Sequence, residues 1–156
     1  MRAPAIVKLD EELCGRIRAG EVVVGSFNVV KELLENAIDA GATRINITTE
    51  FGGYNLIRIQ DNGCGIRKED LEHVCRRHTT SKLKQYEDLK HLSTFGFRGE
   101  ALFSISCAAQ LTISTKTEDS SVGYIATYSN GELICEPKAV ALNTGTTIEV
   151  KDLFKN

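Results

Sequence analysis

NLIRIQDNGCG, residues 55–65, is a short strand pattern that runs directly into a glycine-rich turn. Ile57, Ile59 and Asp61 share one parity, and because side chains alternate between the two faces of a strand, all three point to the same side. The two isoleucines mark that side as buried, and a buried carboxylate needs a hydrogen-bond donor. The stretch therefore predicts a strand that carries Asp61 to the edge of a core.

Two interpretations of this turn remain open from the residues alone. Asp-Asn-Gly is common turn chemistry, so the carboxylate of Asp61 can simply cap its own turn. Alternatively, it accepts a hydrogen bond from a ligand, for which the amino group of an adenine at a pocket floor is one candidate. Gly63 and Gly65 fit both interpretations, since glycine permits a tight turn as well as the close approach of a ligand to the backbone.

The rest of the chain shows helices early and strands late. Apolar residues at helical spacing predict a helix over residues 27–40, with Ser26 as its N-cap and Gly41 as its stop. Further helices are expected over 68–77 and from Gly99, and strands over 44–48, 55–60, 111–115, 123–128, 133–136 and 146–150. Gly52-Gly53 and Asn130-Gly131 predict hairpin turns. This order predicts an α+β layered domain with helices on one face of a mixed sheet.

The composition is that of one ordinary globular domain. The chain has 156 residues and a net charge of −2, so no overall basic field points to nucleic acid, which does not exclude a local basic groove. The five cysteines are odd in number and include no C-x-x-C pair, which is typical of a reduced, intracellular protein. The spacing of Cys64, His73, Cys75 and His78 matches no usual zinc finger, so we interpret them as helix and loop side chains. No apolar run approaches the ~18 residues of a membrane span, and we expect a cytosolic or nuclear protein.

A candidate catalytic pair lies on the first helix. Glu32 and Asn36 are four residues apart and therefore adjacent on one helical face. A carboxylate beside a neutral amide suits a reaction in which Glu32 takes a proton from water while Asn36 supplies an oxygen to Mg²⁺. The alternative is an ordinary solvated face, because Lys31 and Glu35 lie nearby. The spacing also does not choose between Glu32 and Glu35.

Three further stretches fit a phosphate or a base. FGFRGEAL, residues 95–102, places glycines on both sides of Arg98 just before a helix, where successive backbone N–H groups bind anions. No lysine follows the second glycine, so this is not the Walker pattern. Residues 78–82, HTTSK, combine hydroxyls with a lysine and suit a mobile cover, and Thr146 shares the inward parity of Ile148 and Val150. Each stretch also has a simpler interpretation. Residues 95–102 can be an ordinary glycine-containing loop before a helix, residues 78–82 a solvated loop, and Thr146 a threonine bonded to the backbone.

Taken together and in this order, these motifs resemble those of the GHKL ATPases, the superfamily of gyrase B, Hsp90, histidine kinases and MutL. Its motifs E-x-x-x-N, D-x-G-x-G, a glycine-rich loop and a late Gly-Thr strand correspond here to Glu32–Asn36, Asp61–Gly65, Gly96–Gly99 and Gly145-Thr146. The similarity is greatest to the MutL DNA mismatch-repair proteins, in AGEV 19–22, KELLEN 31–36, DAGAT 39–43, DNGCGI 61–66, TSK 80–82 and GFRGEAL 96–102. IRKEDL 66–71 and TTSKL 79–83 resemble the eukaryotic subunit that is shared among MutL heterodimers.

Two stretches depart from the usual MutL pattern. Arg18 stands where these proteins usually have alanine, and Val24–Phe27 stands where many have Arg-Pro. The nucleotide-binding motifs are unchanged. The departures bear on the loop before the first helix and on any dimer contact near it.

The resemblance implies a two-layer α/β sandwich of the GHKL, or Bergerat, type, with a mixed, mostly antiparallel sheet and helices on one face. It implies ATP and Mg²⁺ as ligands, with Glu32 as the general base in preference to Glu35 and Asn36 as the Mg²⁺ ligand. Asp61 would bond the adenine amino group, with Thr146 nearby. The residues it places around the nucleotide are Asn36, Ala40, Asp61, Gly63, Gly65, Thr80, Ser81, Lys82, Gly96, Phe97, Arg98, Gly99, Glu100, Ala101, Leu102 and Thr146.

The resemblance also carries expectations about the whole protein. Residues 1–156 would form one ATPase domain, truncated at its C-terminal end and followed in the family by a domain that offers a lysine to the γ-phosphate. We therefore expect nucleotide binding with slow or no hydrolysis. ATP would switch contacts with a second MutL-type subunit in a heterodimer, with a MutS-type mismatch-recognition complex and, weakly, with DNA, in the nucleus and without a membrane. The alternatives are another GHKL class, which residues 96–102 oppose, and a module that holds ATP as a structural ligand.

Overall fold

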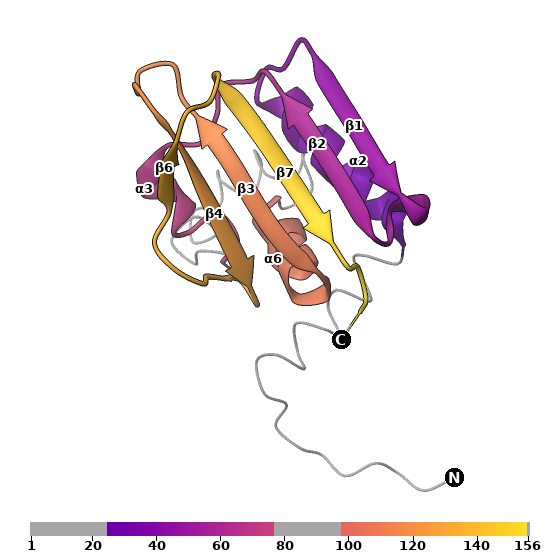
Figure 1. Ribbon diagram of the computed structural model, residues 1–156. Coiled ribbons are helices and arrows are strands. Elements are labelled where there is room, and N and C mark those ends of the chain that lie inside the picture. Colours follow the sequence, from indigo (N-terminus) through magenta and orange to yellow (C-terminus); the bar gives the residue numbers. More distant parts are fainter. Residues whose placement is uncertain (1–24, 77–97, 156) are drawn as a thin grey trace, which may run out of the picture.

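The computed structural model describes residues 25–76 and 98–155, and the side chains of residues 98–100 are not among those described (Figure 1). The helices are α2 (Ser26–Asp39), α3 (Lys68–Leu71) and α6 (Arg98–Ala108), with a 3₁₀ turn at Phe51–Gly53. The strands are β1 (Ile45–Glu50), β2 (Leu56–Asp61), β3 (Gln110–Lys116), β4 (Gly123–Ser129), β5 (Glu132–Leu133), β6 (Lys138–Val140) and β7 (Gly145–Lys151). None of the helices in this described part is long and apolar enough to cross a membrane.

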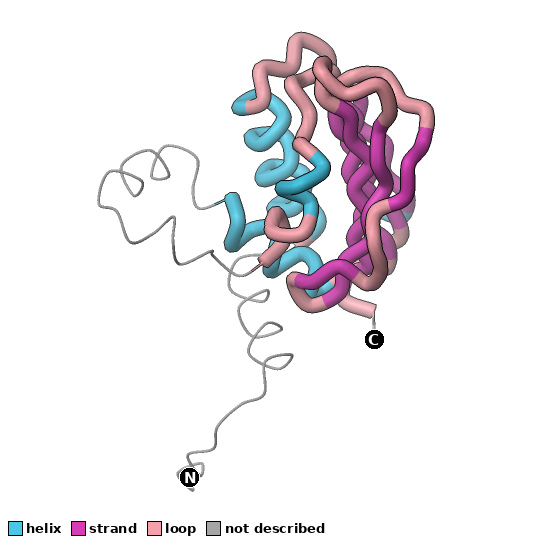
Figure 2. Tube along the Cα trace, turned by 90° about the vertical axis from the view of Figure 1, so that its left-hand side faces the viewer, coloured by secondary structure: helices cyan, strands magenta, loops and turns pink. Residues whose placement is uncertain are grey.

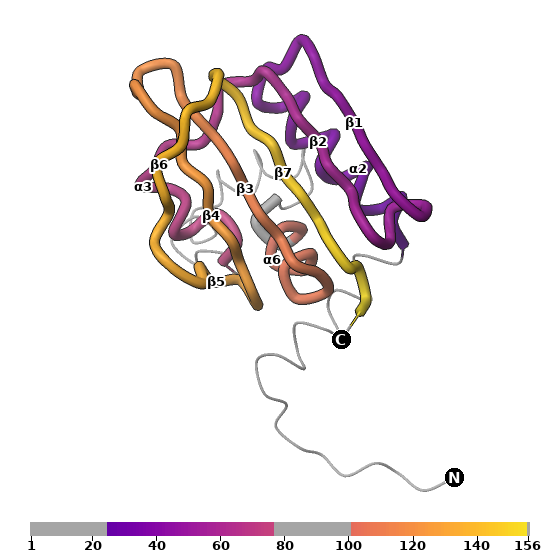
Figure 3. The backbone as a smooth tube through the Cα atoms, viewed as in Figure 1, coloured from indigo at the N-terminus to yellow at the C-terminus, as the bar shows by residue number. Residues whose placement is uncertain are grey.

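The seven strands form one sheet in the order β1-β2-β7-β3-β4-β5, with β6 also paired to β4. Every pairing between described strands is antiparallel. The last strand, β7, lies between β2 and β3, so it joins the early hairpin to the late strands (Figure 3). Viewed from the side, the helices form one layer and the sheet the other (Figure 2). The predicted α+β sandwich with helices on one face is confirmed.

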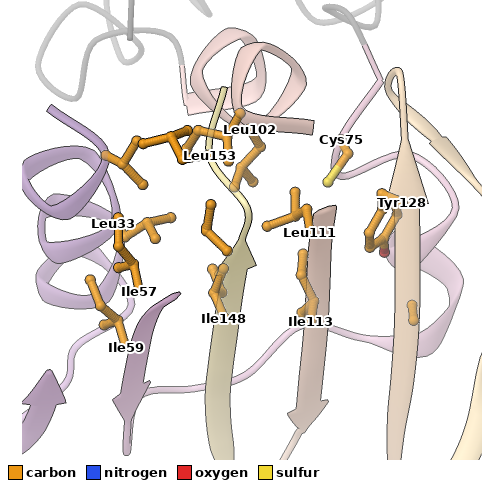
Figure 4. Close-up of a cluster of buried hydrophobic side chains, with 14 of the residues drawn as sticks. Leu33, Ile57, Ile59, Cys75, Leu102, Leu111, Ile113, Tyr128, Ile148 and Leu153 are labelled. Atoms are coloured by element: carbon orange, nitrogen blue, oxygen red, sulfur yellow. The ribbon is translucent and has the colours of Figure 1, made fainter. Parts of the chain in front are cut away.

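The core lies between the two layers and follows from the strand register. Ile59, Ile148 and Ile113 are direct neighbours across three strands, and the next row contains Ile57, Val150 and Leu111. Leu33 from α2 and Leu102 from α6 pack onto these rows (Figure 4), and Ile105 of α6 belongs to the same buried cluster. Fully burying each such side chain stabilises the fold by roughly 1.5–3 kcal/mol. The helix-facing rows therefore fix the register, because a slip by one residue would put polar side chains into the core.

The first helix matches its predicted range, but its N-cap was predicted wrongly. Gly25, not Ser26, is the N-cap, and its N–H donates to Asn28 Oδ1 at 3.0 Å. Ser26 instead donates its hydroxyl to the carbonyl of Gly52, because the hairpin turn lies directly against the start of the helix. Gly41 does end the helix, with a φ of +79° and its N–H bonded to the carbonyl of Ile38.

Two other predicted elements differ from the structure. The helix predicted over 68–77 ends at Leu71, whose carbonyl accepts the Tyr128 hydroxyl at 2.6 Å, and the chain continues in tight turns. The strand predicted over 133–136 is only Glu132–Leu133. Pairing to β4 resumes at Lys138, because Pro137 has no N–H to donate to a ladder, and β6 was not predicted.

Candidate functional site

The helix-facing rows of the sheet are apolar along their length and become polar only at the ends of the strands. There, Asp61 of β2 pairs with Thr146 of β7, which pairs with Thr115 of β3. The two threonine hydroxyls lie 2.9 Å apart, and Thr115 Oγ1 also donates to the carbonyl of Gly145 and accepts the N–H of Ile66. Three strands thus contribute a polar floor to the edge of an otherwise apolar core.

Thr146 faces inward, as its parity predicts, and is only 7% exposed. Thr115, which is 1% exposed and bonded to it, was not predicted as part of this site. The sequence does contain a signal for it, because Thr115 shares the inward parity of Leu111 and Ile113. A threonine on the apolar side of a strand, opposite another such threonine, indicates a shared buried polar contact.

Asp61 is half-buried, and its carboxylate accepts hydrogen bonds on the helix-facing side. Its Oδ1 accepts the N–H of Gly63 at 2.7 Å, so Asp61 does cap its own turn. This bond does not exclude a ligand as a further partner. Burial raises the pKa of Asp61, while hydrogen bonds from the N–H groups of Gly63 and Thr146 lower it less. The carboxylate therefore meets donors on the protein side at the edge of the polar floor, where it can accept a further donor from a ligand.

The glycine turn packs tightly against two other segments. A Cβ on Gly63 would lie 2.8 Å from the carbonyl oxygen of Ala40, and the same carbonyl accepts the N–H of Cys64. Gly65 has a φ of +77°, and a Cβ there would lie 2.1 Å from the backbone oxygen of Lys116. Only glycine fits at either position, so the turn is fixed beside the C-terminal end of α2.

We expect Gly65→Ala to lower the free energy of unfolding by about 3 kcal/mol, because it combines a left-handed backbone with a clash against backbone atoms. Gly41→Ala is the matched control, since Gly41 has a similar φ of +79° but nothing within 4 Å of the added Cβ. That variant should lose only about 1 kcal/mol. Urea unfolding of both variants measures the difference, and equal losses would contradict the close packing of Gly65.

Glu32 and Asn36 lie on α2 beside the stripe of Val29, Leu33 and Ala37 that is buried against the sheet. Glu32 Oε2 and both polar atoms of the Asn36 amide are buried and have no hydrogen-bond partner among the described residues. Most buried polar groups in proteins do have one, so these three atoms call for a ligand, an ion or a water. The fully solvated face considered above does not account for this pair.

The surroundings of Glu32 also favour a proton acceptor. Burial raises the pKa of Glu32, the negative charge of Glu35 raises it further, and Lys31 lowers it. A carboxylate whose pKa is raised toward neutral holds a transferred proton more readily than an exposed one does. The site thus combines a basic carboxylate with an amide that lacks partners.

The predicted phosphate loop is described only in part. Arg98, Gly99 and Glu100 form the first turn of α6, while Thr80, Ser81, Lys82, Gly96 and Phe97 lie outside the described residues. Ala101 and Leu102 are 2% and 5% exposed and belong to the core, so only their backbone groups could meet a ligand. Helix α6 contacts α2, so the two helices lie in the same layer on one face of the sheet.

Known proteins resemble this chain over nearly its whole length. The family model of the histidine kinase-, DNA gyrase B- and HSP90-like ATPases matches residues 24–151. The DNA mismatch repair protein MLH1 of Saccharomyces cerevisiae is 46% identical over 97% of this chain and 20% of its own length. The DNA mismatch repair protein MutL of Pseudoalteromonas translucida is 51% identical over 95% of this chain and 24% of its own length.

Among solved structures, the MutL ATPase domain of Aquifex aeolicus complexed with ADP has a TM-score of 0.64 and 30% sequence identity. The match covers 85% of this chain and 44% of that one. This chain spans no more than about a quarter of the two curated relatives above, which are 20% and 24% covered. Fold, motif order and sequence identity agree, and the chain belongs to the histidine kinase-, DNA gyrase B- and HSP90-like ATPases, within them to the MutL family of DNA mismatch-repair proteins.

Proposed function

We propose that this chain binds Mg-ATP between the sheet and the helices, and that Glu32 and Asn36 face the phosphates. The observation that carries the proposal is the set of buried atoms without partners on Glu32 and Asn36, on the same side of the sheet as Asp61 and Thr146. A nucleotide whose adenine lies at the polar floor and whose phosphates lie near α2 would give hydrogen-bond partners to Asp61 and Thr146 and to Glu32 and Asn36 at the same time. The ADP complex of the Aquifex aeolicus MutL ATPase domain supports a nucleotide as the ligand.

The residues present fit a magnesium ion. Mg²⁺ prefers oxygen ligands and usually keeps several waters, so one protein oxygen plus phosphate oxygens is a common arrangement. Asn36 Oδ1 is buried and without a partner, which makes it the candidate protein ligand. When bound, the ion would neutralise phosphate charge. Glu32, four residues earlier on the same face, would then orient a water and take its proton.

For the other residues we propose the roles that the family resemblance implies. Asp61 would accept the adenine amino group, Thr146 would bond the base, and Ala40, Gly63 and Gly65 would form the turn beside it. The backbone of residues 96–102 would bind the phosphates, covered by Thr80, Ser81 and Lys82. Hydrolysis by residues 1–156 would be slow, because in the family a lysine from a following domain completes the site.

The test is titration calorimetry of the chain with a non-hydrolysable ATP analogue, with Mg²⁺ and with a chelator. We expect saturable binding that Mg²⁺ strengthens by about tenfold or more. Asn36→Ala should bind with the same weaker affinity in both conditions, because it lacks the metal ligand. No binding by the unchanged chain would contradict the proposal, and full Mg²⁺ dependence in Asn36→Ala would move the metal ligand to another residue.

For the whole protein we propose the mismatch-repair role of its relatives. ATP binding and hydrolysis would switch the contacts that this protein makes with a second MutL-type subunit in a heterodimer. They would also switch its contacts with a MutS-type mismatch-recognition complex and with DNA. The curated matches include a eukaryotic MLH1 and a bacterial MutL at similar identity, 46% and 51%, so they support the family equally in both branches. If the protein is the eukaryotic shared subunit, it works in the nucleus, and a fluorescent fusion that stays out of the nucleus would contradict this branch.

A further inference from the structure

The face of the sheet that no described helix covers is turned toward the viewer in Figure 1. A cleft lies on this face, at the end of the strands where β2 ends and β7 begins. Its volume is about 540 Å³, which is the size of a site for one small molecule. The floor is a single polar row: Asn46, Gln60, Thr147 and Ser114 are direct neighbours across β1, β2, β7 and β3. These side chains alternate with the helix-facing residues of the same strands, so the floor of the cleft lies on the opposite face of the sheet from the proposed nucleotide site. The two sites adjoin at the ends of the strands, where Asp61 and Thr146 also line the cleft.

The walls of this cleft are held in place by hydrogen bonds. On one side stands Arg44, just before β1. Asn62 Oδ1 accepts the backbone N–H groups of Thr43 and Arg44 at 2.8 and 2.9 Å, and Asn62 Nδ2 donates to Thr43 Oγ1 at 2.9 Å. On the other side, residues 141–145 rise over the end of β7. A polar outer face is ordinary for a two-layer sandwich, and these two walls are what make it concave.

Two basic side chains and one acidic side chain lie in or beside the cleft. Arg44 forms no ion pair with any described residue, and Lys116 donates to Thr144 Oγ1 at 3.4 Å on the opposite wall. The one acidic residue in the lining, Asp61, accepts from Gly63 with its carboxylate on the helix-facing side. In the next row of the sheet, Arg58 and Glu149 are paired at 3.2 Å and neutralise each other. Within the described part of the chain, Asp61 is thus the one carboxylate in the lining, and its bond to Gly63 is on the other face of the sheet from Arg44 and the polar row.

We propose that this cleft binds a small polar organic anion. Its phosphate or carboxylate group would lie against Arg44, whose planar guanidinium donates to two oxygens of either group at once. The rest of the molecule would hydrogen-bond to the amides of Asn46 and Gln60 and to the hydroxyl of Thr147. Amides and hydroxyls both donate and accept, so the row suits a hydroxyl-rich or amide-bearing body and disfavours an apolar one.

Heteronuclear NMR of the ¹⁵N-labelled chain tests this directly with two probes, ribose 5-phosphate and glutarate. We expect saturable shifts of the side-chain amide signals of Asn46 and Gln60 with at least one probe, and the comparison tells phosphate from carboxylate. Arg44→Gln should weaken binding by about tenfold or more, because it removes the charge-assisted bonds. Gln60→Glu should also abolish binding, since it places a negative charge on the exposed floor without changing the size of the side chain.

Lys151→Gln is the control. It removes one positive charge from the same face of the sheet, two rows away and outside the lining of the cleft, and it leaves the Arg58–Glu149 pair intact. Its affinity should stay that of the unchanged chain. The proposal is overturned if neither probe causes saturable shifts, if Arg44→Gln and Lys151→Gln weaken binding equally, or if the shifts fall on Gly63 and spare Asn46 and Gln60.

Discussion

Asp61→Asn is expected to lower the affinity for an ATP analogue by about tenfold to a hundredfold. This is the usual cost of leaving a buried hydrogen-bond donor without its acceptor. The reason lies in what surrounds the carboxylate. The N–H groups of Gly63 and Thr146 donate to it, and the adenine amino group would be a third donor. Asparagine replaces one acceptor oxygen by an NH₂ group, so one of these donors must face another donor.

This explanation predicts that Asp61→Asn changes the preference between nucleotide bases as well as lowering the affinity for ATP. Inosine triphosphate carries an oxygen where ATP carries the amino group, so it accepts where adenine donates. The preference for ATP over inosine triphosphate should therefore shrink or reverse in Asp61→Asn, measured by calorimetry with hydrolysis-resistant analogues of both. Asp70→Asn, an exposed acid on α3, controls for the loss of one charge. Unchanged discrimination between the two bases would remove Asp61 from the adenine site.

The same substitution should stabilise the protein without nucleotide. Burial raises the pKa of Asp61, so the ionised carboxylate is less favourable in the folded chain than in the unfolded one. Its contribution to stability is full below its ordinary pKa of 3.8 and is lost as the pH rises through the raised value. At neutral pH, Asp61→Asn should therefore melt higher than the unchanged chain while binding less well, a trade that is typical of functional sites.

Local periodicity was sufficient to predict the inward-facing residues of this site. Asp61 and Thr146 were placed correctly because the apolar side chains two residues away on each strand mark the buried face. Their direct pairing could not be predicted, since β7 reaches β2 from the far end of the chain and local patterns do not encode strand order. The contact of Thr115 with Thr146 could not be predicted either, because it depends on β3 lying beside β7.

Long-range contacts also explain the wrong boundaries. Residues 68–77 have a helical pattern, but Tyr128 of β4 donates to the carbonyl of Leu71 and competes for the acceptor that would continue the helix. Ser26 is a good N-cap by residue type, yet the hairpin turn takes its hydroxyl and Gly25 takes the position. Spacing left Glu32 and Glu35 equal, and the structure adds one difference: among the described residues, a buried oxygen without a partner belongs to Glu32 and not to Glu35.

Glu32→Ala is expected to lower the rate of ATP hydrolysis by about a hundredfold or more, the usual contribution of a positioned general base. The affinity for the ATP analogue should change by less than about threefold, because Glu32 acts on water and does not hold the nucleotide. Single-turnover measurements, with the chain in excess over γ-labelled ATP, detect even slow hydrolysis. The same substitutions in a longer protein that includes the following domain would show the effect against a faster rate.

Glu35→Ala decides whether the effect belongs to the position or only to lost charge. Glu35 is one helical turn from Glu32, carries the same charge and helps to raise the pKa of Glu32, so its removal should lower that pKa slightly. Hydrolysis should then fall only a few-fold, since the base is weakened and not lost. A loss in Glu35→Ala as large as in Glu32→Ala would contradict the assignment. Retained hydrolysis in Glu32→Ala would show that Glu32 is not the general base.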